Sequence, residues 1–560
     1  MAHHWFGDLV TMAWWDDTWL NESFGSWVDA PVTEALDPGW RHLAEAQADR
    51  RAAALQADAQ RSVKRIREPV ASAHDIEGSF DNAITYDKGA SVLAMIEAFV
   101  GRERFRAAVT RHLQARAHAA ATAEDLYAAF GAELGPEVAA ALRAFVEQPG
   151  APLVRVEARC QGAPAAHVTQ ARFLADGGAG PGRWRLPLCL KLGAQGRPDA
   201  TVCGWADGAE VELPLPFCPE WLWPNAGGTG YWLSALPAEG LADLSGRLTA
   251  QEQLALATDA RLLARRGDLP VDGTLALGLR LAASEDRLVL RAGRRLLGLV
   301  DRGGLSPDDR ARLRQLHLTV FGPRARAAGW LPSPGESDEQ QALRRELVEA
   351  AAGNGEDPAL EAEARRLAER WLADRRAVPA DVAPVALGVA ARRGDAALFD
   401  ALLDGAARAR DGHDRTTLLR GLGAFRAPAL VRRAQALLVP APGAAPAFDL
   451  RDTLPILHQQ LAEPETQALA WGFLTTHWKA LSSRLRGDEG QWLVVSAARL
   501  ACDASQRRAV AGFLTPRAAR FDGAPRALAV ALEEADACAA ARRRNGPAVS
   551  AFLAREAGGK

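Results

Sequence analysis

The stretch "HHWFGDLVTMAWWDDTWLNESFGSWV", residues 3–28, is rich in tryptophan and combines two histidines with a later carboxylate. His3 and Glu22 have 18 residues between them, so Glu22 stands 19 positions after His3. One class of zinc site takes two histidines from a single helix as H-E-x-x-H and a glutamate from the next helix. In the pattern H-E-x-x-H-x18-E the glutamate follows the second histidine by this same interval. The spacing therefore fits His3 and Glu22 as zinc ligands and excludes His4 by one residue, but a His and a Glu separated in this way also occur often by chance.

The composition is that of an ordinary globular protein of several domains. The chain has 560 residues, 48% apolar and 24% charged, which is too long for a single core. Its net charge of −2 gives no positive field to attract nucleic acid or an anionic membrane. The sequence has no run of about 18 apolar residues, so we expect no membrane span. The oligomeric state is not readable from these features.

The order of sequence patterns predicts a mainly α protein with a small β-sandwich in three domains. Residues 1–150 carry apolar residues at three- and four-residue spacing, typical of helices. Residues 151–237 hold short alternating runs divided by Gly, Pro and Asp, the length of an antiparallel sandwich of about seven strands. Residues 238–560 return to helix-length segments, and their spacing resembles that of a HEAT-like helical solenoid.

The six cysteines form no C-x-x-C pair, which argues against a zinc knuckle or a thioredoxin-type site. Four of them fall between Cys160 and Cys218. We expect reduced, buried thiols in a β core rather than disulfides, although the pattern permits both. The sequence leaves the compartment open: a cytoplasmic location is slightly favoured, and a periplasmic or secreted one is possible because the true N-terminus is expected to be missing.

Residues 3–28 closely resemble the zinc-binding segment of the M1 family of aminopeptidases, whose usual run is H-E-x-x-H-Q-W-F-G-N-x-V-T-x-x-W-W-x-D-x-W-L-N-E-G-F-A. The resemblance continues in "ITYDKGASVLAMIEAFVG" (84–101), which matches the Y-x-K-G-A segment of that family. "FVEQPGAPLVRVE" (145–157) looks like the junction between its catalytic domain and β-sandwich, and "PNAGGTGYWLSAL" (224–236) resembles the end of that sandwich.

This resemblance implies a function as well as a fold. Residues 1–150 would be the C-terminal part of a thermolysin-like catalytic domain. The intact protein would be a zinc-dependent aminopeptidase that removes N-terminal residues from peptides, with one Zn²⁺ polarising the scissile carbonyl and activating water. The resemblance makes His3 and Glu22 metal ligands, and Tyr86 the catalytic residue that stabilises the oxyanion. The partners it implies are peptides with a free N-terminus. Which side chains such peptides carry is not readable.

One departure from the family pattern bears on activity. The first zinc histidine of the family would lie four residues before His3 and the catalytic glutamate three before it, so both precede Met1. We therefore expect a chain truncated inside H-E-x-x-H, with Met1 at the first variable position, that is inactive as given. The alternative is a non-catalytic helical scaffold or interaction protein derived from the same fold.

Two further expectations concern the neighbours of these residues. Asp16 and Asp17 could orient His3 or cap the helical run that carries Glu22, and a cap is favoured for at least one of them because they precede that run. Six aromatic residues of the opening stretch are predicted to pack in the core rather than to form a ligand-stacking box: Trp5, Phe6, Trp14, Trp15, Trp19 and Trp27. His4 is predicted to have a supporting or structural role.

Overall fold

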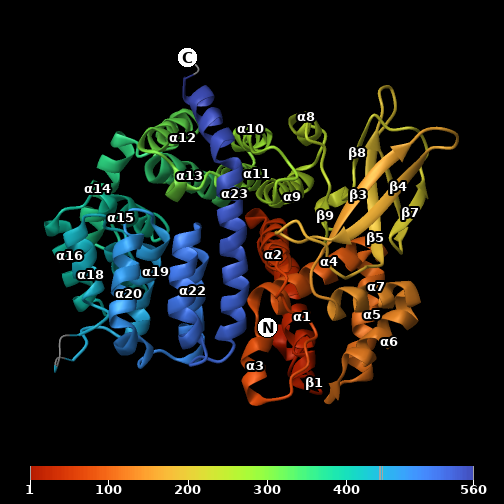
Figure 1. The fold of residues 1–560 in the computed structure, drawn as a ribbon, viewed down its shortest axis with the longest axis horizontal. Helices are drawn as coiled ribbons and strands as arrows, with labels where there is room; N and C mark the ends of the chain where they lie inside the picture. Colours follow the sequence, from red (N-terminus) through yellow and green to blue (C-terminus); the bar gives the residue numbers. More distant parts are fainter. Residues whose placement is uncertain (1, 441–442, 444, 559–560) are drawn as a thin grey trace. The chain divides into compact units, whose positions relative to one another are not determined.

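A computed structural model describes residues 2–440, 443 and 445–558, and its ribbon is drawn in Figure 1. Met1, to which we assigned a position in the histidine motif, lies outside the described residues. The chain divides into two compact units, Met1–Leu299 and Val300–Lys560. The three domains predicted with boundaries at 150/151 and 237/238 stay a prediction beside this two-unit division.

The first unit begins with helices that surround the candidate site. They are α1 (Trp19–Leu36), α2 (His42–Asp58), α3 (Ala73–Ser79), a π-helix (Asn82–Lys88), α4 (Gly89–Val100), α5 (Arg102–Ala115), α6 (Ala123–Leu134) and α7 (Pro136–Glu147). A two-stranded parallel ladder joins β1 (Val10–Met12) to β2 (Ala119–Ala121). Thr122 and Asp125 form a capping box that starts α6, because each side chain accepts a hydrogen bond from the backbone amide of the other residue.

A β-sandwich follows, in the region coloured yellow in Figure 1. One sheet has the order β7-β4-β3-β9 and the other β6-β5-β8. Their bounds are β3 (Pro152–Arg159), β4 (Ala165–Arg172), β5 (Leu186–Gly193), β6 (Ala200–Ala206), β7 (Glu210–Pro214), β8 (Trp221–Trp223) and β9 (Leu233–Ser234). All neighbouring pairs are antiparallel except β3 with β9. The predicted sandwich of about seven strands is confirmed.

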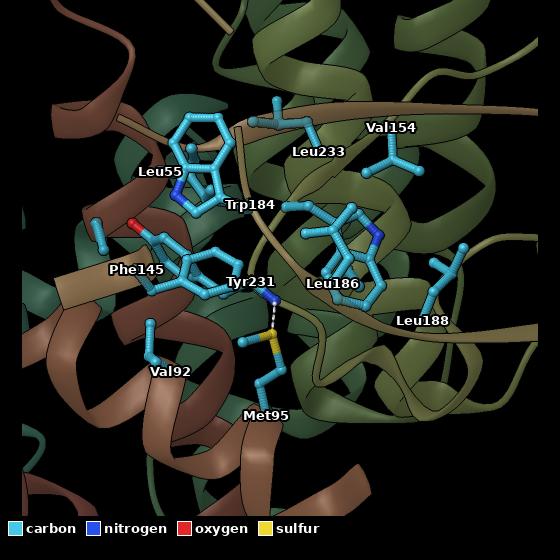
Figure 2. Close-up of a cluster of buried hydrophobic side chains, with 14 of the residues drawn as sticks. Leu55, Val92, Met95, Phe145, Val154, Trp184, Leu186, Leu188, Tyr231 and Leu233 are labelled. Carbon is cyan, nitrogen blue, oxygen red and sulfur yellow. Dashed lines mark hydrogen bonds between the residues drawn. The ribbon is translucent and has the colours of Figure 1, made fainter. Parts of the chain in front are cut away.

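The sandwich and the helices share one apolar core (Figure 2). Leu55 of α2, Met95 of α4 and Phe145 of α7 meet Leu186 and Tyr231 of the sandwich region in this cluster. Fully burying a large apolar side chain contributes about 1.5–3 kcal/mol, so the shared core fixes the sandwich against the helices that carry the site.

Four more helices complete the first unit: α8 (Leu241–Ser245), α9 (Ala250–Arg266), α10 (Val271–Ala282) and α11 (Arg287–Leu297). Helix α2 is tied to α11 by the ion pair of Glu45 with Arg287, at 2.8 Å. It is tied to α9 by the buried pair of Arg51 with Asp259, also at 2.8 Å. These two ion pairs therefore fix α2 against α9 and α11.

The second unit is helical throughout its described residues. After α12 (Pro307–Ala328) and α13 (Asp338–Val348) come a π-helix (Glu349–Asn354), α14 (Pro358–Ala373), α15 (Ala383–Arg392), α16 (Ala396–Arg408), α17 (Gly412–Gly423), α18 (Pro428–Gln435), α19 (Leu450–Ala462), α20 (Gln467–Ser482), α21 (Gly487–Arg499), α22 (Ala504–Ala518) and α23 (Ala524–Gly558). The last helix, α23, packs against α12, α21 and α22. The predicted mainly α architecture is confirmed, and none of the described helices combines the length and apolar character that crossing a bilayer requires.

All six cysteines are paired in disulfides. Cys160 bonds Cys218, and Cys189 of β5 bonds Cys203, the residue directly opposite it on β6. Cys502 bonds Cys538 in the second unit. The reduced state that we expected for the four sandwich cysteines is therefore wrong. The strand pairing brings Cys189 and Cys203 together, a contact that their spacing in the sequence does not reveal.

Candidate metal centre

His3 lies in a short 3-10 turn, Ala2–His4, at the start of the described chain. Its Nδ1 is 3.0 Å from the backbone carbonyl oxygen of Phe6. Because a carbonyl oxygen only accepts hydrogen bonds, Nδ1 is the donor, and Nε2 of the neutral ring presents its lone pair. Metal-binding histidines are commonly oriented in this way, with the second ring nitrogen tied to a protein oxygen.

Glu22 lies in the first turn of α1 and faces that lone pair. Its Oε2 is 3.7 Å from His3 Nε2, and the side chains are 16% and 59% exposed, respectively. Zinc bonds of about 2.0–2.2 Å at a tetrahedral centre place two ligand atoms about 3.3–3.5 Å apart. The nitrogen and oxygen donors therefore fit a zinc ion with only a small adjustment. His4, which the spacing excludes, pairs instead with Asp8 at 3.3 Å.

Tyr86 comes to the same place from a distant part of the sequence. It lies within the π-helix Asn82–Lys88 and is half-buried, and its phenol is close enough to the Glu22 carboxylate for the two groups to interact. Burial raises the pKa of Tyr86 above its ordinary value, and the negative charge of Glu22 raises it further. The structure thus brings together His3, Glu22 and Tyr86, the three residues that the sequence singled out. Their roles as ligands and catalyst stay predictions.

A direct contact between α1 and the π-helix sets this arrangement. Ser23 Oγ donates a 2.6 Å hydrogen bond to the backbone carbonyl of Thr85. A Cβ added at Gly89 would lie only 1.9 Å from that same Oγ, so this close approach requires glycine. We assigned no role to Ser23 from the sequence. The usual family run has Gly where this chain has Ser23, a difference that marks the position but does not reveal its partner, Thr85.

Asp17 fixes the start of α1, although not by capping it. Helix α1 begins at Trp19, and no side-chain hydrogen bond caps its first turn. Asp17 is buried and accepts hydrogen bonds from the backbone amide of Ala123, at 3.0 Å, and from the Trp19 indole, at 3.3 Å. It also forms a 2.9 Å ion pair with Arg67. The predicted cap on α1 is therefore wrong, because this carboxylate serves the first turn of α6 instead.

The aromatic residues around the pair divide between core and surface. Phe6, Trp19 and Phe24 are buried, and the rings of Phe6 and Phe24 stack with centroids 4.8 Å apart. Phe6 and Trp19 thus follow the prediction of core packing. Trp5 and Trp14 do not, since they are 52% and 55% exposed.

Comparison with known proteins supports this fold. Residues 1–148 match the Peptidase family M1 domain, and residues 221–537 match the ERAP1-like C-terminal domain. Aminopeptidase M1-B of Oryza sativa subsp. japonica is 29% identical over 383 residues, covering 65% of this chain and 43% of that protein. Aminopeptidase 2 of Candida albicans is 28% identical over 448 residues, covering 78% and 48%.

A third relative has a different name. Tricorn protease-interacting factor F2 of Thermoplasma volcanium is 34% identical over 190 residues, covering 34% of this chain and 24% of that protein. The chain spans about half the length of the curated aminopeptidases that it matches over most of its own length. The ERAP1-like C-terminal domain alone accounts for more than half of the 560 residues. Since the M1 domain precedes it, the chain belongs to the M1 peptidase family.

Proposed function

We propose that this chain carries one side of the active site of a zinc-dependent aminopeptidase. One observation carries the proposal: His3 Nε2 and Glu22 Oε2 lie 3.7 Å apart, with the other ring nitrogen of His3 held by a backbone carbonyl. The relatives named aminopeptidases support the choice of reaction. Peptides with a free N-terminus are the proposed substrates.

His3, Glu22 and Tyr86 have distinct proposed roles. His3 and Glu22 would hold the zinc, one through a neutral nitrogen and the other through a carboxylate oxygen. Zinc, when bound, supplies Lewis-acid polarisation of a carbonyl and lowers the pKa of water. Tyr86 donates a hydrogen bond from its phenol to the oxygen of the scissile carbonyl as negative charge develops there. With an ordinary pKa of about 10, a tyrosine phenol keeps its proton at neutral pH.

Two parts of the family pattern lie ahead of Met1 in numbering. These are the first histidine ligand and the glutamate that acts as general base. We propose that residues 1–560 on their own hydrolyse no peptide, because they supply two of the three ligands and lack the base of the motif. A general base contributes roughly 10²- to 10⁴-fold to such a reaction.

Hydrolysis of aminoacyl-arylamides tests the proposal. The chain of residues 1–560 with added zinc should show no turnover above background. The same chain extended by the codons that precede Met1 in its gene, if these encode the His-Glu pair and the rest of the domain, should give turnover that a chelator abolishes. Chelator-sensitive turnover by residues 1–560 alone would overturn our account of the missing base. An extended chain that binds zinc and hydrolyses nothing would favour the scaffold alternative.

The disulfides favour a compartment other than the cytoplasm. Disulfides persist in oxidising compartments and are rare in the cytosol. All six cysteines of the chain are paired, in the sandwich and in the second unit. We therefore propose that the protein matures in an oxidising compartment.

A further inference from the structure

Lys88, at the end of the π-helix that carries Tyr86, is fully buried. Its ammonium lies 2.9 Å from Asp58 Oδ2, and neither side chain is exposed to solvent. Asp58 is the last residue of α2. An ion pair this deep is expensive, because the desolvation of both charges can exceed their mutual attraction. Its presence two residues from Tyr86 therefore calls for a reason other than general stability.

The pair belongs to a network in which each polar group has partners. Lys88 Nζ also donates to the backbone carbonyls of Gln148, at 3.3 Å, and Gly150, at 3.0 Å. Asp58 accepts from the amide of Gly150, at 3.1 Å, and from the Tyr231 hydroxyl, at 2.8 Å. An ammonium has three protons and here meets three acceptors. A buried network satisfied in this way holds one arrangement of its members.

The members come from parts of the first unit that are far apart in sequence. Gln148 and Gly150 form the linker from α7 into the first strand of the sandwich, and Tyr231 precedes its last strand, β9. The Tyr231 ring packs against Phe145, and its amide donates to Met95 Sδ at 3.3 Å, as the dashed line in Figure 2 shows. The residues that lead into the first and last strands of the sandwich thus both hydrogen-bond the Lys88–Asp58 pair.

Tyr86 and Lys88 lie on different faces of the helical turn that contains them, because residues two apart on a helix do not face each other. Lys88 is held inside the core while the Tyr86 phenol reaches Glu22. We propose that the Lys88–Asp58–Tyr231 network is a positioning device for Tyr86, and that it makes the position of the phenol depend on the docked sandwich. This inference rests on the role of Tyr86 in the proposed function.

A second buried ion pair, between Arg51 and Asp259, provides a matched control for this proposal. Arg51 lies about two turns before Asp58 on α2, and its guanidinium is 2.8 Å from Asp259. It also donates to the backbone carbonyls of Gly230, at 2.9 Å, and Trp232, the two neighbours of Tyr231. Its hydrogen bonds and ion pair thus hold the same sandwich end to α2 and α9 and do not include the π-helix. Loss of either pair should destabilise the unit, and loss of the Lys88 pair alone should loosen the Tyr86 segment.

Hydrogen exchange of the chain of residues 1–560, followed by mass spectrometry, separates these effects. In K88M and in the milder Y231F, amides of 82–89 should exchange about 10-fold faster or more, relative to α6 in the same sample. In R51M the exchange rate of amides 82–89, divided by that of α6, should stay at its wild-type value. An unchanged ratio in Y231F, or an equal rise in R51M, would overturn the proposal. Y231F, which removes one hydroxyl, decides the matter even where K88M does not fold.

A second measurement uses the extended chain with its upstream codons. There Y231F should lower kcat about 10-fold while KM and the zinc content per chain stay at the wild-type values. A matched loss of zinc, or a rise in KM with unchanged kcat, would contradict a positioning role. The exchange experiment needs no activity, so it tests the network even where the proposed function fails.

Discussion

The hydroxyl of Ser23 donates a 2.6 Å hydrogen bond to the backbone carbonyl of Thr85. It therefore joins the residue after Glu22 to the residue before Tyr86. The two candidate site residues, Glu22 and Tyr86, are 64 positions apart in sequence, and this contact brings their backbones together. The position of the Tyr86 phenol against Glu22 thus follows from a backbone approach rather than from the side chains alone.

The closeness of this approach predicts a pair of compensating substitutions. A Cβ at residue 89 would lie 1.9 Å from Ser23 Oγ and 2.5 Å from Ser23 Cβ, so G89A should destabilise the first unit by about 1–3 kcal/mol through overpacking. S23G removes both clashing atoms and should restore much of the loss in the double variant. Urea unfolding of the two single variants and the double variant measures this coupling. Additive losses would show that the contact is not the cause.

The extent to which the sequence predicted this site depended on how local each signal was. His3 and Glu22 could be proposed as a metal pair because both lie within one short stretch, whose spacing fits such a site and whose surrounding residues resemble the family segment. The assignment of Tyr86 needed the family resemblance, since nothing in its own surroundings places it near Glu22. The Ser23–Thr85 contact depends on how two segments pack, which no local pattern encodes.

The same limit explains two predictions that were wrong. Asp17 has the local signature of a cap for α1, but its carboxylate accepts the amide of Ala123, 106 positions away. The position of Asp17 just before α1 indicated a cap on α1, but it could not show that the first turn of α6 lies beside the carboxylate. The seven-strand sandwich was predictable from alternation and turn residues, whereas the cross-strand pairing of Cys189 with Cys203 needed the register.

Zinc content provides a test of the ligand assignment. In the extended chain, E22A should lose zinc, because two histidines and water hold the ion far more weakly than a three-ligand set. The loss in affinity should exceed the roughly 10–100-fold that changing a group behind the ligands costs. Glu34 lies on the same helix, and its carboxylate accepts the amide of Leu43 at 3.1 Å, so E34A is the control. An E22A chain that still binds one zinc ion per chain would rule out Glu22 as a ligand.

Acid should weaken the first unit through His112. Burial lowers the pKa of His112 from about 6.5 to about 4, and the positive charge of Arg116 acts in the same direction against the opposing Asp125. Between pH 6.5 and 4, His112 therefore binds a proton in the unfolded chain but not in the folded chain. The free energy of unfolding accordingly falls as the pH drops through this range. A shift of this size corresponds to about 3 kcal/mol across that range.

The variant H112L isolates this contribution. Nδ1 of His112 has no hydrogen-bond partner among the described residues, so leucine removes a titrating group without breaking a hydrogen bond at that nitrogen. Urea unfolding of wild type and H112L at pH 7.5, 6 and 5 should give a shallower pH dependence in the variant. Parallel curves would show that His112 does not titrate in this range.

Thiol labelling tests the three disulfides. In denaturant without reductant, protein from its native source should react with no alkylating agent, and after reduction all six cysteines should react. Replacing Cys160 and Cys218 together by serine should lower stability by about 2–5 kcal/mol, because this bond closes a long loop in the unfolded chain. Free thiols in the isolated protein would contradict both the pairing and the proposed oxidising compartment.

A substitution at Tyr86 distinguishes an effect on catalysis from an effect on zinc or substrate binding. In the extended chain, Y86F should keep its zinc and its KM, because the phenol oxygen is neither a ligand nor, in the proposed mechanism, a ground-state contact. Its kcat should fall by roughly 10²- to 10³-fold, as on removal of one oxyanion donor. Y127F is the matched control, since the buried hydroxyl of Tyr127 has no hydrogen-bond partner among the described residues. It should leave kcat unchanged. Equal kcat values for Y86F and Y127F would show that the oxyanion is stabilised by another group.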